Sequence, residues 1–203
     1  MRKRTSTVST LDRCRRKIGK GGPQSLAALV AAYLADEDNC TDEMSHYRSA
    51  PTWRESVRRA AFCERLKKDG RVVRHGHQPG NRFSKELLAQ AFSELLHADL
   101  KGAKDFHDLL TRVEACIGDI RGIGELYVYD VSHRIGACLK PRLRPKFIYL
   151  HAGTRAGAKA LCLDWRKDEL EMSELPAAIR RLTPEQVEDF LCRCRDEFPS
   201  LKA

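Results

Sequence analysis

The chain has 203 residues and a formal net charge of +9 at pH 7. This length permits one substantial apolar core, and the positive charge favours a polyanionic partner such as nucleic acid. No apolar run approaches the roughly 20 residues that a membrane span needs, and the N-terminus lacks the apolar stretch of a signal peptide. We therefore expect a soluble, cytoplasmic protein with no membrane partner.

The positive charge is unevenly distributed along the chain. Residues 1–20 contain eight Lys or Arg and one acid, and residues 131–163 contain seven Lys or Arg and no acid. From Asp164 to the end, ten acids outnumber seven bases. The sequence therefore predicts one cationic face, preceded by a basic arm over residues 1–22.

Cysteine and histidine residues give no strong indication of a metal site. The eight cysteines are scattered and include no CxxC pair. Several of them fall at apolar helical positions, so we expect reduced, buried thiols. His75 and His77 flank a glycine, but two ligands without a third are more typical of a solvated basic loop. We predict neither a metal nor a cofactor.

Apolar residues recur with helical spacing through most of the chain. This pattern predicts an all-α or mainly α fold, a helical bundle within a single domain over residues 23–203. Ser25 and Ser84 each precede such a pattern and are expected to cap helices. Pro51 is expected to open a helix that runs from Trp53 to about Lys68.

Three further segments carry more local predictions. Residues 71–82 are basic and rich in turn residues, which predicts a loop or a short hairpin. Residues 147–150 form a short apolar run, either a strand or a buried link. Residues 175–198 predict two helices, the second of which begins with Thr183 as its cap.

The most informative stretch is the turn Gly122-Ile123-Gly124, between two segments with helical apolar stripes. Because glycine has no side chain, backbone N–H groups in such a turn can approach a phosphate at the start of the next helix. The turn therefore predicts contact with the backbone of double-stranded DNA. We expect the following helix to end at Gly136.

A second glycine-containing segment begins at His151. It resembles another turn, with Thr154 as the cap of a following helix. Arg155 and Lys159 add positive charge to that helix. The two helix N-termini are therefore expected to face the same DNA backbone.

The stretch from Ile120 to Asp130 resembles the hairpin of helix-hairpin-helix DNA-binding proteins, whose pattern is apolar-x-Gly-apolar-Gly followed by a helix. The resemblance covers about residues 104–136. Within that group, the base-excision DNA glycosylases place an all-α domain around such a hairpin and use an aspartate downstream of it. The resemblance implies an enzyme that hydrolyses the N-glycosidic bond of a modified or damaged base.

Two departures from the glycosylase pattern limit what the resemblance implies. The region expected to hold the family's aspartate, residues 149–154, contains His151 and no acid. The lysine of the lyase members would fall near Leu126. We therefore expect a monofunctional glycosylase that uses Asp130 or, as a second choice, Asp164.

The chemistry of the reaction points to the same residues. Cleavage of an N-glycosidic bond needs a carboxylate that stabilises an oxocarbenium-like sugar or activates water. Asp130 lies near the turn, and His133, one helical turn later, can orient it or share a proton. His151 is a third candidate catalytic residue. Tyr127 and Tyr129 are expected to contact a flipped base.

Arg134, Thr154, Arg155 and Lys159 complete the expected DNA contacts by holding the distorted backbone. Each candidate also has a structural interpretation. Asp130 and Arg134 have the i,i+4 spacing of a surface ion pair. The tyrosines and histidines equally suit a half-buried core, and the glycine turn can be only a tight corner.

Three functional classes remain open. The pattern Val128-Tyr-Asp, Arg134-Ile-Gly and Tyr149-Leu-His-Ala-Gly-Thr-Arg also resembles uncharacterised bacterial proteins of mobile and defence regions. This favours a phage-defence glycosylase that excises a hypermodified base such as glucosylated hydroxymethylcytosine, ahead of a repair enzyme. The second class is a non-enzymatic helix-hairpin-helix module that recruits a partner. The third is a nuclease or toxin that uses His133 or His151. The oligomeric state is not predicted.

Overall fold

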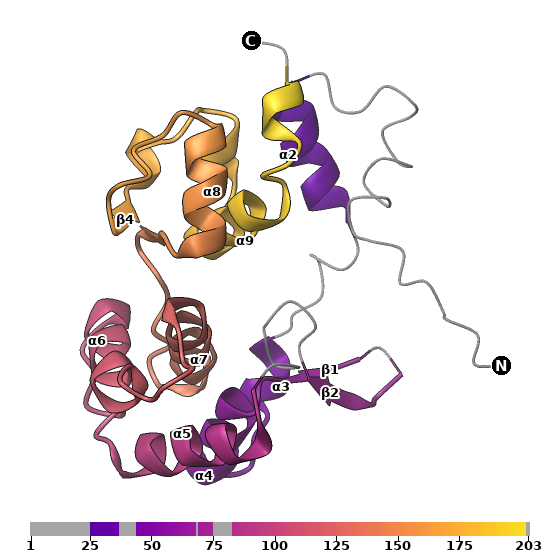
Figure 1. Cartoon of the computed structure of the whole chain (residues 1–203). Helices are drawn as coiled ribbons and strands as arrows, with labels where there is room; N and C mark the ends of the chain where they lie inside the picture. The colour runs from indigo at the N-terminus through magenta and orange to yellow at the C-terminus, as the bar shows by residue number, and fades with distance from the viewer. Residues whose placement is uncertain (1–24, 37–43, 68, 75–82, 202–203) are drawn as a thin grey trace, which may run out of the picture. The chain divides into compact units, whose positions relative to one another are not determined.

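The computed structural model describes residues 25–36, 44–67, 69–74 and 83–201. These residues form eight α-helices and two small two-stranded sheets (Figure 1). The prediction of a mainly α fold is therefore confirmed. The predicted basic arm over residues 1–22, and the pair His75 and His77, lie outside the described residues.

Packing divides the described residues into two compact units, each with buried apolar side chains of its own. Unit 1 contains residues 25–36 and 147–201, and unit 2 contains residues 44–67, 69–74 and 83–146. Helical periodicity is a local signal, so it does not reveal that the chain leaves unit 1 after one helix and returns to it at Phe147. The single domain expected over residues 23–203 spans both units.

Unit 1 is a small helical unit around an apolar core that includes Leu29, Ile148 and Phe190. A two-residue ladder between β3 and β4 confirms that the apolar run at residues 147–150 contains a strand. The elements are α2 (Leu26–Ala35), β3 (Ile148–Tyr149), α8 (Ala152–Ala160), β4 (Glu169–Leu170), α9 (Pro184–Arg193) and the 3-10 helices η2 (Met172–Glu174), η3 (Ile179–Arg181) and η4 (Phe198–Ser200).

The predicted N-cap residues of α2 and α9 in unit 1 are confirmed. The Ser25 side chain accepts a hydrogen bond from the backbone N–H of Ala28 at 3.3 Å. Thr183 and Gln186 form a reciprocal capping box at the start of α9.

Two helices were predicted over residues 175–198, and the prediction of the first is wrong. Only the three-residue turn η3 forms there. The Arg180 side chain within it donates to the carbonyl groups of Leu175 and Ser173. These bonds hold a compact turn, and Pro184 soon afterwards restricts the backbone before the next helix.

The prediction of a second glycine turn is also wrong, because Gly153 and Gly157 lie inside α8. α8 and α9 lie side by side (Figure 1). A Cβ atom on Gly157 would overlap the carbonyl oxygen of Leu191, and one on Gly153 would come within 2.5 Å of the sulfur of Cys192. These glycines therefore permit close helix packing rather than an open turn.

Unit 2 consists of five helices and a hairpin. In chain order they are α3 (Met44–Arg48), α4 (Trp53–Ala61), β1 (Glu64–Leu66), β2 (Val72–Arg74), α5 (Lys85–His97), α6 (Phe106–Ile117) and α7 (Glu125–Cys138). The cap predicted at Ser84 is confirmed by its bond from the Leu87 N–H at 3.1 Å.

The helix expected from Trp53 to Lys68 ends early, at Ala61. Cys63 adopts a left-handed backbone conformation, with φ of 53°. This conformation does not continue an α-helix, and the chain enters β1 at Glu64. Hydrogen bonds to β2 then replace the predicted helical bonds.

Gly136 does not end α7 as predicted, because the helix continues to Cys138. Gly136 instead lets the connector after α7 fold back onto the helix. The Leu143 N–H donates to the Gly136 carbonyl at 3.1 Å, and a Cβ on Gly136 would lie 2.6 Å from the Leu143 oxygen. The glycine serves a close backbone approach.

The expected burial of the thiols holds for only part of the described chain: Cys63 is buried, whereas Cys162 is exposed. No helix in the described ranges has the length and hydropathy that crossing a membrane would require.

Candidate nucleic-acid interface

The Gly122–Gly124 turn connects α6 to α7, which pack together in unit 2. Both glycines are exposed. Gly122 has φ of +101°, which strains any residue with a side chain, and a Cβ on Gly124 would meet nothing within 4 Å. Space for an approaching ligand is therefore present on the outer side of Gly124.

Gly124 is the N-cap of α7 and provides no side-chain cap. The N–H of Ile123 donates to the Ile120 carbonyl. The N–H groups of Gly124, Glu125 and Leu126 donate to no group in the described part of the chain, as the first turn of a helix allows. These donors suit a phosphate oxygen.

The side chains beside the turn have mixed charge. Arg121 and Glu125 are both exposed. Arg121 attracts an anion, whereas Glu125 in the first turn of α7 already complements the helix dipole and opposes an anion. The turn alone therefore makes a modest anion site.

The connector after α7 presents a regular row of cations. Its apolar residues Leu143 and Pro145 are buried, and the residues that alternate with them are exposed. Burial of Leu143 and Pro145 holds this segment on unit 2, while the charged side chains remain in solvent. We call this row the cationic strip: Lys140, Arg142, Arg144 and Lys146.

Asp130 and Arg134 form an ion pair along α7, with 3.5 Å between Oδ2 and Nη2. The Asp130 side chain is 21% exposed and that of Arg134 only 4%. The Arg134 guanidinium carbon lies 5.7 Å from the centre of the Tyr47 ring. Arg134 is therefore an interior residue that orients Asp130, and it lies away from the surface where DNA contacts were expected.

The two tyrosines expected beside a flipped base are buried. Tyr127 is 1% exposed, and its hydroxyl donates to the Ala61 carbonyl at 2.7 Å. Burial raises its pKa well above the usual range. Tyr129 is 4% exposed, and its ring packs against those of Phe106 and His133. In this conformation neither tyrosine presents its ring for stacking on a base.

His151 and Thr154 belong to unit 1, whereas the Gly122 turn belongs to unit 2. His151 is the N-cap of α8, and its Nε2 lies 2.5 Å from Oε1 of Glu188. Thr154 is fully buried and accepts a bond from the His151 N–H at 2.7 Å. The Glu188 carboxylate therefore lies beside this helix start, where it opposes a phosphate.

Arg155 and Lys159 also have contacts within unit 1. Arg155 donates to the Trp165 and Lys167 carbonyls and pairs with Asp168. The Lys159 ammonium lies 5.2 Å from the centre of the Trp165 ring. Lys159 is exposed, so it remains accessible to an anion.

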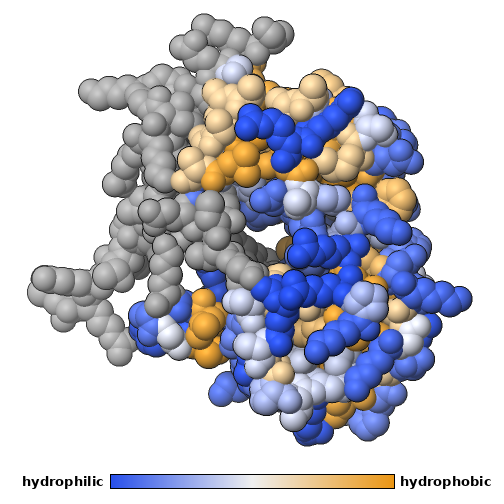
Figure 2. All heavy atoms as spheres, turned by 180° about the vertical axis from the view of Figure 1, so that it is seen from behind, coloured by the Kyte–Doolittle hydropathy of each residue, from blue (hydrophilic) through white to orange (hydrophobic). Residues whose placement is uncertain are grey.

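Comparison with known proteins adds no family: no protein-family model, curated protein or solved structure matches the chain. The described ranges contain no group of three or more His, Cys, Asp or Glu side chains that could hold a metal ion. Figure 2 shows that hydrophilic residues cover much of one face, with apolar areas between them.

The individual DNA-binding residues expected from the sequence do not include the cationic strip, although the expected cationic stretch over residues 131–163 contains it. The signal was present, because Leu143 and Pro145 alternate with charged residues at a spacing of two. A loop or short hairpin was expected within residues 71–82, whereas the observed hairpin pairs β2 with β1, whose residues were expected to continue a helix.

Proposed function

We propose that unit 2 binds double-stranded DNA through its phosphate backbone. The observation that carries this proposal is the cationic strip, four exposed cations in an acid-free stretch of chain. Cations that replace condensed counterions supply most of the affinity of sequence-independent DNA binding. The strip fits that role because its backbone is held by buried neighbours.

The turn before α7 supports the same proposal at a second point. α7 has 14 residues, from Glu125 to Cys138, which corresponds to about 21 Å of helix. The free N–H groups and the start of the strip are therefore separated along the helix. In this proposal α6, the turn and α7 act as the helix-hairpin-helix element that the sequence resembles, and two separate contacts set the orientation of the duplex.

A salt series with two charge-matched variants tests the proposal. The strip variant changes Lys140, Arg142, Arg144 and Lys146 to Gln. The control variant removes the same charge from unit 1 by changing four exposed cations: Arg166, Lys167, Arg181 and Arg195. Binding of the full chain to a fluorescent duplex is measured by anisotropy.

We expect the strip variant to bind more weakly and to lower the slope of log K against log salt by about 3 to 4. The control variant should keep the slope of the native chain. Equal losses in both variants would show that only total charge matters, and no loss in either would place the DNA contact elsewhere.

A glycosylase that uses Asp130 is the second candidate, and the ion pair with Arg134 favours it. This pair orients a carboxylate that remains partly exposed on α7, and an oriented carboxylate can stabilise an oxocarbenium-like sugar. The substrate would be a duplex with a modified base, including a hypermodified phage base. In this version the base must reach Asp130 without stacking on the buried tyrosines.

Genomic DNAs with different base modifications, incubated with the protein and then treated with alkali, test this second candidate. Strand breaks that appear only after alkali indicate base excision. Asp130→Asn should abolish them, while Asp119→Asn, an exposed acid beside the same turn, should not. Unchanged breaks in Asp130→Asn would remove that residue from catalysis, and breaks without alkali would indicate a nuclease or a lyase.

A further inference from the structure

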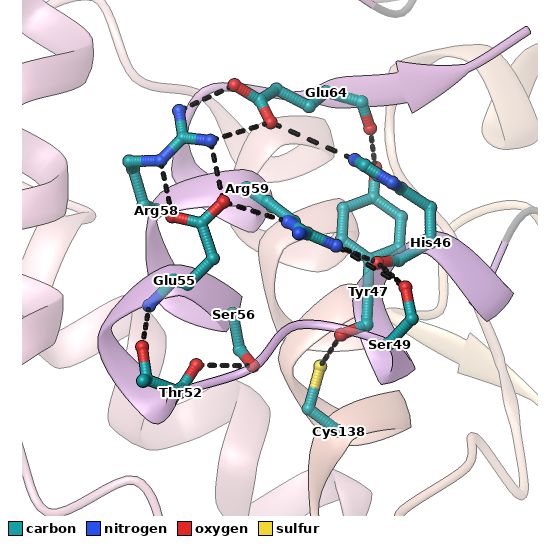
Figure 3. Close-up of polar contacts among 10 residues, drawn as sticks. All are labelled: His46, Tyr47, Ser49, Thr52, Glu55, Ser56, Arg58, Arg59, Glu64 and Cys138. Carbon is teal, nitrogen blue, oxygen red and sulfur yellow. Dashed lines mark hydrogen bonds and ion pairs between the residues drawn. The ribbon is translucent and has the colours of Figure 1, made fainter. Parts of the chain in front are cut away.

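The hairpin β1–β2 is attached at its base by a dense polar network (Figure 3). The Tyr47 hydroxyl donates to the Glu64 carbonyl. Arg58 donates to both carboxylate oxygens of Glu64, at 2.6 and 3.0 Å, and to both of Glu55. The backbone and side chain of the first β1 residue are thus both fixed to α3 and α4.

The free end of the same hairpin exposes an apolar pair. Leu66 and Val72 are directly opposite each other in the ladder, and they are the large apolar side chains most open to solvent in the described residues, at 46% and 51%. Opposite residues of an antiparallel pair point to the same face. The two side chains therefore form one small apolar tip on a firmly attached base.

Positive charge surrounds this tip. Residues 64–74 contain five Lys or Arg and two acids, and both acids are paired with arginine, Glu64 with Arg58 and Asp69 with Arg71. Lys67 and Arg71 are exposed beside the apolar pair. The environment of the tip is therefore cationic.

This combination discriminates between possible occupants. A second copy of the hairpin would bring like charges together, which opposes association. Two apolar side chains are too few to anchor a protein to a membrane. A DNA groove accepts a two-stranded ribbon, offers phosphates to the flanking cations, and exposes base steps into which apolar side chains can wedge.

We infer that the β1–β2 hairpin enters a groove of duplex DNA and that Leu66 and Val72 wedge into a base step and unstack it. This inference rests on the proposed DNA binding by unit 2. The cations of the hairpin contact phosphates, and the apolar pair contacts the bases. The hairpin therefore deforms the duplex, while the cationic strip supplies sequence-independent affinity.

The test uses the full chain and a duplex that contains 2-aminopurine, whose fluorescence rises when the base is unstacked. Anisotropy of a dye on the same duplex measures binding separately. The native chain should raise the 2-aminopurine signal on binding. The double change Leu66→Ser with Val72→Ser should lose this rise and weaken binding, without changing the salt slope, because no phosphate contact is removed.

The conservative double change Leu66→Met with Val72→Ile is the matched control and should keep the fluorescence rise. Circular dichroism of each variant checks that unit 2 is folded. Binding with no fluorescence rise in the native chain would overturn the hairpin inference alone, and no binding at all would overturn the proposed function as well. A loss of self-association in the serine variant, with the fluorescence rise retained, would show that the tip contacts a second copy.

Discussion

Two glycine pairs of this chain, each expected from the sequence to form a turn, have opposite structural roles. In unit 2, Gly122 and Gly124 lie in an exposed turn, and Gly124 has open space where a side chain would be. In unit 1, Gly153 and Gly157 are covered by α9. A glycine near a helix start therefore allows another group to approach the backbone closely. Whether that group is a ligand or another helix depends on the neighbouring elements.

The two units also differ in net charge: the described part of unit 2 is positive and that of unit 1 is negative. The described residues of unit 2 contain eighteen Lys or Arg and twelve Asp or Glu, whereas those of unit 1 contain eight and eleven. Unit 1 has an acid, Glu188, beside the start of α8. Unit 2 has free N–H groups at the start of α7 and the cationic strip after its end. Charge and backbone exposure thus support the proposal that unit 2 is the unit that binds nucleic acid.

The largest expected difference in stability is between an alanine substitution at a covered glycine, Gly157, and one at an exposed glycine, Gly124. Gly157→Ala should destabilise the protein by about 3 kcal/mol, because the new Cβ overlaps the Leu191 backbone and α8 must move from α9. Gly124→Ala should cost at most about 1 kcal/mol, as a poorer N-cap. Urea unfolding with hydrogen exchange in each unit measures both. Equal costs would contradict the difference between the two glycine pairs.

Acid should destabilise unit 2 through Glu55. Hydrogen bonds from Arg58, and then from Arg59, lower the pKa of Glu55 to about 2. Because this pKa lies below its unfolded value, the stabilisation is present above about pH 4.5 and is lost as the pH falls towards 2. We expect a loss of about 2 kcal/mol over that window. Glu55→Gln should remove this pH dependence, whereas unchanged dependence would assign it to another group.

A smaller effect is expected nearer neutral pH, from His46 at the base of the hairpin. Burial, and then the neighbouring Arg59, lower the pKa of His46; Glu64 and Glu55 oppose this shift. The histidine contributes stability that is present above pH 6.5 and is lost as the pH falls below it. His46→Gln should flatten this part of the stability profile. A profile that is already flat in the native chain would refute the prediction.

The smallest effect on stability is expected for the exposed pair of Arg71 and Asp69. Their side chains are 70% and 49% exposed, and ion pairs in solvent contribute little. Arg71→Ala should leave the unfolding midpoint unchanged but lower the DNA salt slope by about 1, if Arg71 contacts a phosphate. Arg166→Ala in unit 1 is the control and should change neither quantity.

Local signals predicted three helix starts correctly, because a capping bond is made within three residues, but the predicted cap Thr154 lies inside α8, whose N-cap is His151. Ser25, Ser84 and Thr183 each accept the expected bond. Helix ends were predicted less well. The helix from Trp53 stops at Ala61 because the chain pairs with β2, and α7 passes through Gly136 because the glycine is needed by the connector. Both outcomes depend on residues that lie beyond the end of the helix concerned, in β2 and in the connector after α7.

The candidate site was predicted in part. The exposed glycine turn and the cationic segment after α7 were visible in the sequence, whereas the positions of the individual side chains were not. Asp130 and Arg134 do form the ion pair that their spacing allows. Tyr127 and Thr154 are buried. Helical spacing alone did not reveal the burial of Tyr127, because α3, α4 and α6 all pack against α7.

The sequence by itself determined the mainly helical class, the principal N-caps and the uneven charge, because these depend on composition and on contacts within a few residues. The tertiary structure decided which glycines face solvent, which cations remain exposed and which aromatic rings are buried. Those properties depend on packing between separate segments of the chain, such as α8 against α9 and α4 against α7. Packing also left Leu66 and Val72 exposed at the tip of a hairpin that the helical pattern concealed.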